Sequence, residues 1–308
     1  MNLQAVLARP FSPVVQRYTW RDAALYALAL GMAQDPLDAD ELPYVYERYE
    51  TGRWGELGQS GPEGPFRAVP SFCVTLGWLP FWQDEPALAI GWQRIVHGEM
   101  SFALQRPLAA ESCVRATHRI AAIQDKGAGR GALVHVDKEI LDAASGEPIA
   151  TLRSVEFLRD DGGCGDWSQG GEARAPLPPL PDTFSATATM DCPTTRQAAL
   201  VYRLASGDFM PIHADPDVAR RAGFERPISH GLNNLGIACR ALLKHFAPGR
   251  PERLREMGVR FVQPGLPGDT VRVEMMPSAT EPRLVHFRAR ALERDVPLLD
   301  RGVCRLHG

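Results

Sequence analysis

The sequence predicts an α+β protein in which one unit, a central helix wrapped by an antiparallel sheet, is built twice. Three observations support this prediction. Helix-like stretches precede strand-like stretches in each half of the chain. A segment rich in glycine and proline, 161–182, separates the halves and has the composition of a linker. Short motifs recur in both halves at fixed offsets. The predicted units are an N-terminal half at 1–160, a linker at 161–182 and a C-terminal half at 183–308.

In the first half, a helix signal stands at Thr19, whose side chain can cap a helix, with Asp22 three residues further on. An alanine- and leucine-rich helix is expected from there to about Leu30. A short apolar stretch that begins at Pro70 predicts a buried helix of two turns. Four antiparallel strands separated by turn residues are then expected at 101–105, 113–122, 131–141 and 149–158.

The second half repeats this order. Thr194 and Gln197 form a second potential capping box, and Asp215 is expected to cap a short helix. Ser229 is expected to cap the longest apolar helix, which runs to about Phe246. Four more strands are predicted at 257–263, 270–276, 283–293 and 296–306.

The repeat also indicates which half carries chemistry. Pro70 and Pro227 each precede an apolar helix, and Pro107 and Pro264 begin matching motifs, at an offset of 157 residues in both cases. In the preceding helices the offset is 176, which sets Asp208 against a methionine of the first half with no histidine nearby. The first half is therefore expected to be a scaffold and a wall for the substrate.

Composition excludes several classes of protein. The 308-residue chain has a formal net charge of −3, and its lysines and arginines are scattered, which argues against a sequence-independent nucleic-acid surface. The longest apolar run, 23–33, is too short to span a bilayer, and the order of residues typical of a signal peptide is absent. The six cysteines contain no Cys-x-x-Cys pair and are typical of reduced thiols. We expect a cytoplasmic protein with no nucleic-acid or membrane partner.

Asp208 and His213 are the strongest candidates for acid/base chemistry. Gly207 and Pro211 prevent the preceding helix from continuing, so both side chains should lie in a loop between two helices and can point into one pocket. Histidine titrates near neutral pH, and a nearby carboxylate can fix its tautomer or handle a second proton. The alternative is that Asp208 caps a loop and that His213 is a structural histidine.

The helix start after Ser229 offers a site for developing negative charge. Its first N–H groups lack intrahelical acceptors, and the helix dipole favours an anion there. Gly231 permits close approach because it has no side chain. The alternative is that His230 and Gly231 serve only helix-start packing.

The sequence gives less support to two other kinds of site, a metal site and a serine-hydrolase site. His213 and Asp215 have the H-x-D spacing of non-haem iron sites, with His230 or His286 as a third ligand. Asp215 is better explained as a helix cap, so we expect no metal. A serine-hydrolase elbow is absent, because the chain has no Gly-x-Ser-x-Gly motif.

The segments 205–216 and 222–231 together resemble the signature of (R)-specific enoyl-CoA hydratases, the MaoC-like dehydratases. The two-half organisation resembles the double-hot-dog members of that family over nearly the whole chain. The resemblance implies a double hot-dog fold, a 2-enoyl-CoA substrate and reversible addition of water to give a (3R)-hydroxyacyl-CoA. It also implies that no metal or redox cofactor takes part, and that the protein is a homodimer, because exposed hot-dog sheet edges often pair.

Carried over residue by residue, the resemblance assigns Asp208 and His213 as the catalytic pair and the Gly231 N–H as the donor to the thioester oxyanion. We assign His213 as the principal base and Asp208 as proton donor and water-orienting partner, although the two roles could be exchanged. Met210 departs from the family, which usually has an asparagine there to hold the reacting water. Methionine cannot supply that hydrogen bond. Either another group replaces it, with Asn233 and Asn234 near the helix start as candidates, or activity is reduced or shifted in substrate.

The acyl-CoA substrate should also be held by groups outside the acid/base pair. The cationic candidates for its phosphates are Arg203, Arg226, Arg240 and Lys244. The apolar run 72–82 is a candidate wall for the acyl chain, although such aromatic clusters are more often core. A hot-dog acyl-CoA thioesterase and a non-catalytic acyl-CoA-binding paralogue, the latter suggested by Met210, remain alternative functions.

Overall fold

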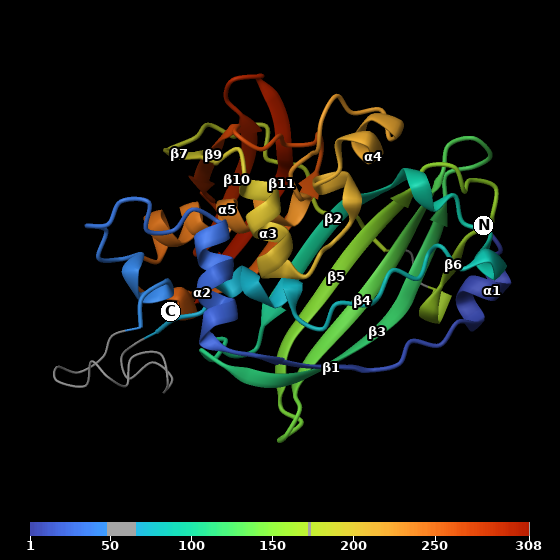
Figure 1. Cartoon of the computed structure of the whole chain (residues 1–308), viewed down its shortest axis with the longest axis horizontal. Coiled ribbons are helices and arrows are strands. Elements are labelled where there is room, and N and C mark those ends of the chain that lie inside the picture. The colour runs from blue at the N-terminus through green and yellow to red at the C-terminus, as the bar shows by residue number, and fades with distance from the viewer. Residues whose placement is uncertain (48–65, 172–173, 308) are drawn as a thin grey trace.

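In the computed structural model, which describes residues 1–47, 66–171 and 174–307, one large antiparallel sheet runs through both halves of the chain (Figure 1). The α-helices are α1 (Leu3–Ala8), α2 (Trp20–Ala29), α3 (Ala198–Ser206), α4 (Pro216–Arg221) and α5 (Gly231–Phe246). The strands are β1 (Val14–Tyr18), β2 (Ile95–Leu104), β3 (Ser112–Asp125), β4 (Ala132–Asp142), β5 (Pro148–Leu158), β6 (Trp167–Ser168), β7 (Ala188–Pro193), β8 (Leu254–Phe261), β9 (Thr270–Pro277), β10 (Leu284–Ala291) and β11 (Val296–Leu306). Short 3₁₀ helices are η1 (Leu42–Tyr44), η3 (Pro70–Thr75), η4 (Pro86–Leu88), η5 (Trp92–Arg94), η6 (Gln169–Gly171), η7 (Pro211–His213) and η8 (Pro251–Arg253).

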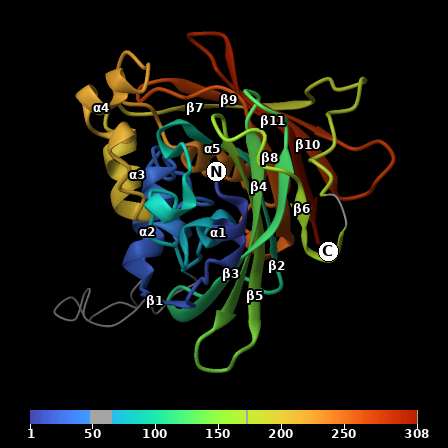
Figure 2. The ribbon, with the colours of Figure 1, turned by 90° about the vertical axis from the view of Figure 1, so that its right-hand side faces the viewer.

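The sheet has an approximate two-fold symmetry that follows from the sequence repeat. Its strand order is β1-β3-β4-β5-β2-β8-β11-β10-β9-β7, so the same order is met outward from the β2–β8 junction on both sides. At the junction, Ser101 lies opposite Gly258, and these two residues are also equivalent under the 157-residue offset. The helices α2 and α3, which are equivalent under the second offset, pack side by side (Figure 2). The predicted duplication is confirmed.

The two halves differ in their central helix. In the second half, α5 is buried along most of its length and contacts β8, β9 and β11. Its counterpart in the first half is the six-residue 3₁₀ helix η3, whose residues are all buried. The helix predicted at Pro70 is thus present but short, so it covers much less of the first-half sheet than α5 covers of the second.

Helix starts were predicted with mixed success. Thr19 and Asp22 form the expected capping box of α2, and Asp215 accepts hydrogen bonds from the first turn of α4. The expectation for Thr194 was wrong, because its hydroxyl donates to the Asp269 carbonyl at 2.7 Å and α3 begins only after Gln197. In both correct cases the partners lie within one turn of the same helix, where local sequence decides.

The predicted cap of α5 was also wrong by one residue. The N-cap is His230 rather than Ser229, and its side chain makes no capping bond. The N–H of Ser229 is used elsewhere, in a 2.8 Å hydrogen bond to the Gly265 carbonyl. The loop before β9 therefore sets where α5 starts.

The segment predicted as a linker lies against the sheet. Strand β6 within it pairs with β3, and the N–H of Leu177 donates to Glu99 Oε2 at 3.0 Å. Leu177 also packs beside Gly258, so the segment passes over the junction between the halves. Residues 172–173 of this segment lie outside the described residues. The strands β1 and β7, which pair with β3 and β9, were not predicted.

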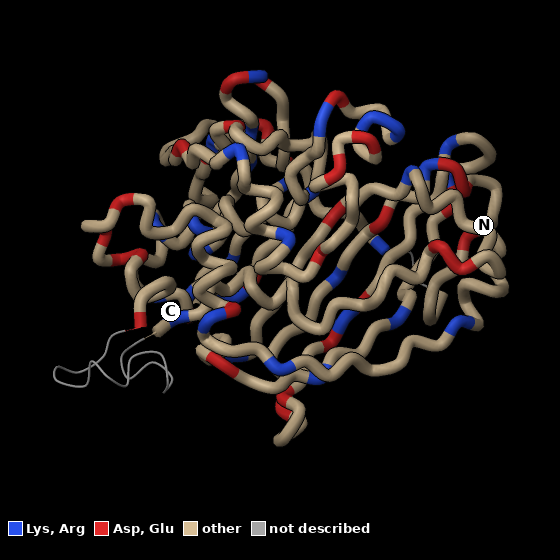
Figure 3. The backbone as a smooth tube through the Cα atoms, in the orientation of Figure 1, with Lys and Arg blue, Asp and Glu red and all other residues tan. Residues whose placement is uncertain are grey.

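Charge is mixed along the chain rather than gathered by sign (Figure 3). Within the described ranges, no helix is long and apolar enough to cross a membrane.

Candidate active site

Asp208 is held just past the end of α3, as predicted. Gly207 ends the helix in the left-handed conformation (φ +74°), which favours glycine, and turns the chain toward the interior. The Asp208 N–H donates to Ser206 Oγ at 3.2 Å, and Asp208 Oδ1 accepts from the Met210 N–H at 3.1 Å. The residue is buried, with 9% of its surface exposed. One carboxyl oxygen is therefore fixed by the loop, and the other is available to a ligand.

His213 ends the short helix η7, and its tautomer is set by a backbone group. Its Nδ1 lies 2.9 Å from the Ile228 carbonyl, which can only accept, so Nδ1 carries the hydrogen and Nε2 is left unprotonated. Burial lowers the pKa of His213, and the opposing effect of Asp208 is smaller. The neutral ring with a free Nε2 is the form that a general base needs.

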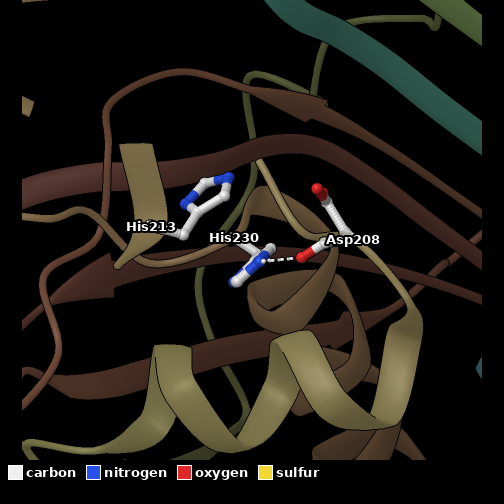
Figure 4. Close-up of side chains that lie close together, drawn as sticks. All are labelled: Asp208, His213 and His230. Atoms are coloured by element: carbon white, nitrogen blue, oxygen red, sulfur yellow. Dashed lines mark hydrogen bonds between the residues drawn. The ribbon is translucent and has the colours of Figure 1, made fainter. Parts of the chain in front are cut away.

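His230 completes the cluster and was not predicted as part of the acid/base machinery. Its ring stacks on that of His213, with centroids 3.7 Å apart and planes inclined by 23° (Figure 4). Its Nε2–H donates to the backbone carbonyl of Asp208 at 3.2 Å, and its Nδ1 is enclosed without a partner. Burial, with the His213 ring next in importance, lowers the pKa of His230 to about 4. Neutral His230 therefore hydrogen-bonds to the backbone of Asp208 while its ring packs against the ring of His213. In the sequence, the position of His230 directly before Gly231 is the signal that indicates a place at the site.

The metal set weighed from the sequence is not assembled. Asp215 accepts two backbone N–H bonds at the start of α4, and His286 does not belong to the cluster. Among the described residues, the ligand atoms of Asp208, His213 and His230 do lie within 4.8 Å of one another. Each of the two rings already uses one nitrogen on a backbone carbonyl, and the remaining nitrogen of His230 is enclosed. This arrangement fits proton transfer at His213 Nε2.

Gly231 is the first residue of α5, so its N–H precedes the first intrahelical bond. The N–H of Asn233 is already bonded to the His230 carbonyl at 3.1 Å. A Cβ on Gly231 would lie only 3.1 Å from Phe261 Cδ1, which shows how closely the wall approaches this backbone. The N–H of Gly231, favoured by the helix dipole, is well suited to an anionic oxygen.

These groups open onto one cavity of about 2580 Å³ that both halves line. Asp208, Met210, His213, His230 and Gly231 form its wall in the second half. In the first half the wall is the sheet face left uncovered by the short η3, together with Trp78, Phe81 and Trp82 of the predicted apolar run. Phe72 of that run is core instead.

Of the two asparagines considered as substitutes at the Met210 position, only one lines the cavity. Asn234 is part of its wall. Asn233 is buried, and its amide donates to the Ala29 carbonyl of α2 at 3.3 Å. Asn234 is therefore the one that can reach a ligand.

None of the four cations proposed for CoA lines the cavity. Arg240 is buried in an ion pair with Glu41, at 2.6 Å and 2.9 Å, and Lys244 pairs with Asp38. The guanidinium of Arg203 lies over the Phe209 ring at 4.8 Å, and Arg226 is exposed. Proximity in sequence to the motif was misleading, because nine residues of helix carry Arg240 about 14 Å along the α5 axis from Gly231. The cavity is lined instead by Arg94, Lys126, Lys138, Arg159, Arg174, Arg221, Arg260 and Arg301.

Comparison with known proteins identifies two matching families, one in each half. Residues 16–160 match the MFE-2 hydratase 2 N-terminal domain, and residues 184–285 match the MaoC like domain. Peroxisomal enoyl-CoA hydratase 2 of Arabidopsis thaliana is 30% identical over 97% of this chain and 93% of its own. The 3-hydroxyacyl-thioester dehydratase Y of Mycobacterium tuberculosis is 36% identical over 92% and 89%.

Solved structures agree with these matches. A MaoC-like dehydratase from Phytophthora capsici superposes with a TM-score of 0.81 at 27% identity, covering 100% of this chain and 99% of that one. Full-length peroxisomal multifunctional enzyme type 2 from Drosophila melanogaster gives 0.75 at 26% identity, covering 96% of this chain and 48% of that one. A Mycobacterium tuberculosis protein described as a double hotdog gives 0.53 at 15% identity, covering 96% of each chain, and supports the fold alone. With its duplicated sheet, its two domain matches and these relatives, the chain belongs to the MaoC-like dehydratase family and has the double hot-dog fold.

Proposed function

We propose that the protein is an (R)-specific 2-enoyl-CoA hydratase, a hydro-lyase that reversibly adds water to a trans-2-enoyl-CoA to give a (3R)-hydroxyacyl-CoA. One observation carries the proposal: Asp208, the free Nε2 of His213 and the N–H of Gly231 meet at a single cavity. The relatives named enoyl-CoA hydratase 2 and dehydratase Y support the same reaction in its two directions.

The reaction requires stabilisation of charge on the thioester oxygen. When the oxygen of water bonds to C3, the electrons of the double bond move toward the carbonyl, which becomes enolate-like. The N–H of Gly231 at the start of α5 donates to that oxygen, and the helix dipole adds to the stabilisation. Donors of this kind are typically worth about 10²–10³ in rate.

Proton transfer is assigned to the acid/base pair. His213 Nε2 takes a proton from water, and the Asp208 carboxyl delivers one to C2, so that one proton leaves the water and one reaches the product. Transfer of the proton from His213 to Asp208 restores the starting state, and the reverse sequence dehydrates the hydroxyacyl thioester. The Nδ1–H bond to Ile228 supports His213 as the base, because it leaves Nε2 as the acceptor. With the two roles exchanged, the same atoms balance.

Met210 leaves the water with fewer fixed partners than an asparagine would. The free oxygen of Asp208 and Nε2 of His213 are its remaining ligands, with the Asn234 amide as a third that can reach the cavity. For the CoA phosphates, two exposed cations of the second half line the cavity, Arg221 at the end of α4 and Arg260 of β8. They replace the four candidates expected from the sequence.

The test is to incubate the protein with crotonyl-CoA and longer enoyl-CoAs while following loss of enoyl absorbance, release of thiol and the chirality of the product. Asp208→Asn and His213→Ala should each lose hydration. Asp217→Asn and His286→Ala, the same changes outside the cavity, should retain it. Hydration that persists in both site variants would refute the site. Thiol release without hydration would favour a thioesterase, and binding without turnover a non-catalytic paralogue.

Assembly and compartment remain proposals as well. The outer edges of β1 and β7 end the sheet and are suited to pairing, which supports a homodimer. Light scattering on the purified protein tests this, since a monomer mass would contradict it. We propose a cytoplasmic location, although the Arabidopsis thaliana relative is described as peroxisomal. Imaging of a tagged protein in its own cell distinguishes the two.

A further inference from the structure

The wall of the cavity in the first half contains a carboxyl group that the hydration chemistry does not use. A row of β5 residues lines the cavity: Leu152, Ser154, Val155, Glu156 and Phe157. Glu156 is the only charged member of this row and lies between Val134 of β4 and His97 of β2. Glutamate is rarely placed in such a setting without a partner, because removing a carboxylate from water is costly. Its presence calls for a ligand or a structural partner.

The structural partner accounts for only one of its two oxygens. Gln83 Nε2 donates to Glu156 Oε2 at 2.8 Å, and Gln83 Oε1 accepts from the Trp82 N–H at 3.1 Å. Gln83 is only 5% exposed, so its amide is held in one orientation. Within the described part of the chain, Glu156 forms no salt bridge with a lysine or arginine, and no hydrogen bond reaches its Oε1. Burial raises the pKa of Glu156, and the charge of the neighbouring His97 opposes this increase. A pre-oriented carboxyl oxygen is therefore left for a ligand in the cavity.

The position of this carboxyl fits the acyl side of the substrate. His97 faces Glu156 across the β2–β5 pair, and its ring lies 5.9 Å from that of Phe261. Phe261 in turn packs against Gly231, the proposed donor to the thioester oxygen. All of these residues line the same cavity. Two aromatic rings thus separate the carboxyl from the reacting end, and an acyl chain that extends into the first half passes it.

We propose that Glu156, oriented by Gln83, is a subsite for a hydroxyl group on the acyl chain, so that the protein acts on hydroxylated enoyl thioesters. The inference rests on the proposed hydratase function and specifies its substrate class. A hydroxyl both donates and accepts, so it satisfies the carboxyl in either protonation state. A plain alkyl chain would leave the second oxygen of the carboxyl without a hydrogen bond, and a carboxylate on the chain would be repelled by it.

The experiment measures the ratio of kcat/KM for a hydroxylated enoyl-CoA to that for the unsubstituted enoyl-CoA of equal length, with the hydroxyl moved along the carbons beyond C4. For the wild-type protein, at least one hydroxylated isomer should be preferred. In Glu156→Leu the ratio for that isomer should fall about tenfold, the value of roughly one hydrogen bond to a buried polar group. Glu139→Leu, the same change on the outward face of the neighbouring strand, should leave the ratio as in the wild type.

The outcomes separate the two claims. A wild-type preference that Glu156→Leu abolishes supports the subsite. Hydration of plain enoyl-CoAs with no preferred hydroxylated isomer, or a preference that survives Glu156→Leu, overturns the subsite and leaves the proposed function intact. Either of these two outcomes would mean that Glu156 binds only water. Failure to hydrate any enoyl-CoA overturns both. If Glu156→Leu does not fold, Gln83→Leu, which releases the oriented carboxyl, must lower the same ratio.

Discussion

Replacement of Gly231 by alanine should abolish activity while leaving the fold almost unchanged. The backbone there is not in the left-handed region, and the atoms nearest to the added methyl all belong to the Phe261 ring, the closest at 3.1 Å and 3.3 Å, so a ring shift of a few tenths of an ångström relieves the contact. Alanine also has the higher helix propensity, by up to about 1 kcal/mol. The free energy of unfolding should therefore change by no more than about 1 kcal/mol. Because the methyl occupies the cavity beside the oxyanion donor, kcat/KM should fall by about 10²–10³.

Gly236 of the same helix provides a matched control with the opposite expectation. A Cβ there would lie 2.3 Å from Leu30 Cδ2 and 2.9 Å from the Tyr26 hydroxyl, in the packed contact between α5 and α2. Gly236→Ala should destabilise the protein by about 1–3 kcal/mol and leave kcat/KM per folded molecule near the wild-type value. Urea unfolding and enoyl-CoA hydration are measured for both variants. A fivefold loss of kcat/KM corresponds to roughly 1 kcal/mol. A Gly231→Ala protein with wild-type stability and a smaller loss than this would refute the oxyanion assignment.

Three further predictions follow from the site and the contact between the halves. Met210→Asn should raise kcat/KM for a good enoyl-CoA, because the amide can hold the reacting water; an unchanged or lower value contradicts this. With His213 as base, kcat/KM should be lost as pH falls through the pKa of that ring, which burial places below the ordinary 6.5, and an acidic limb above 6.5 would point to another group. Arg240→Met strands the buried carboxylate of Glu41 and should cost about 3–5 kcal/mol in urea unfolding; a loss below about 1 kcal/mol would show that the pair is not a significant link.

Local sequence predicted those features whose partners lie close along the chain. The Thr19 capping box, the Asp215 cap and the eight strands of the two four-strand groups all follow from patterns a few residues long. The pairing of Ser101 with Gly258 also follows, because the repeat itself specifies which positions are equivalent. The short edge strands β1 and β7 carry little periodic signal and depend on β3 and β9 for their existence.

The errors at the site have a tertiary origin. Ser229 resembles a cap, but the Gly265 carbonyl, 36 residues away in sequence, takes its N–H and moves the helix start to the next residue. The role of His230 depends on the His213 ring stacked on it and on its hydrogen bond to the Asp208 carbonyl in another loop. Arg240 is paired by Glu41 of the other half. No pattern within one segment reports such partners.

The unequal covering of the two halves also bears on how such a protein can change. The proposed acid/base groups stand on loops around α5, whereas much of the rest of the cavity wall belongs to strands of the other half. A substitution on β5 can therefore alter which thioesters are accepted without displacing the atoms that move protons. In the proposed binding mode, the duplication therefore separates substrate choice from reaction chemistry. The shared β2–β8 junction keeps both functions within one molecule, since separation of the halves would expose two bare strand edges.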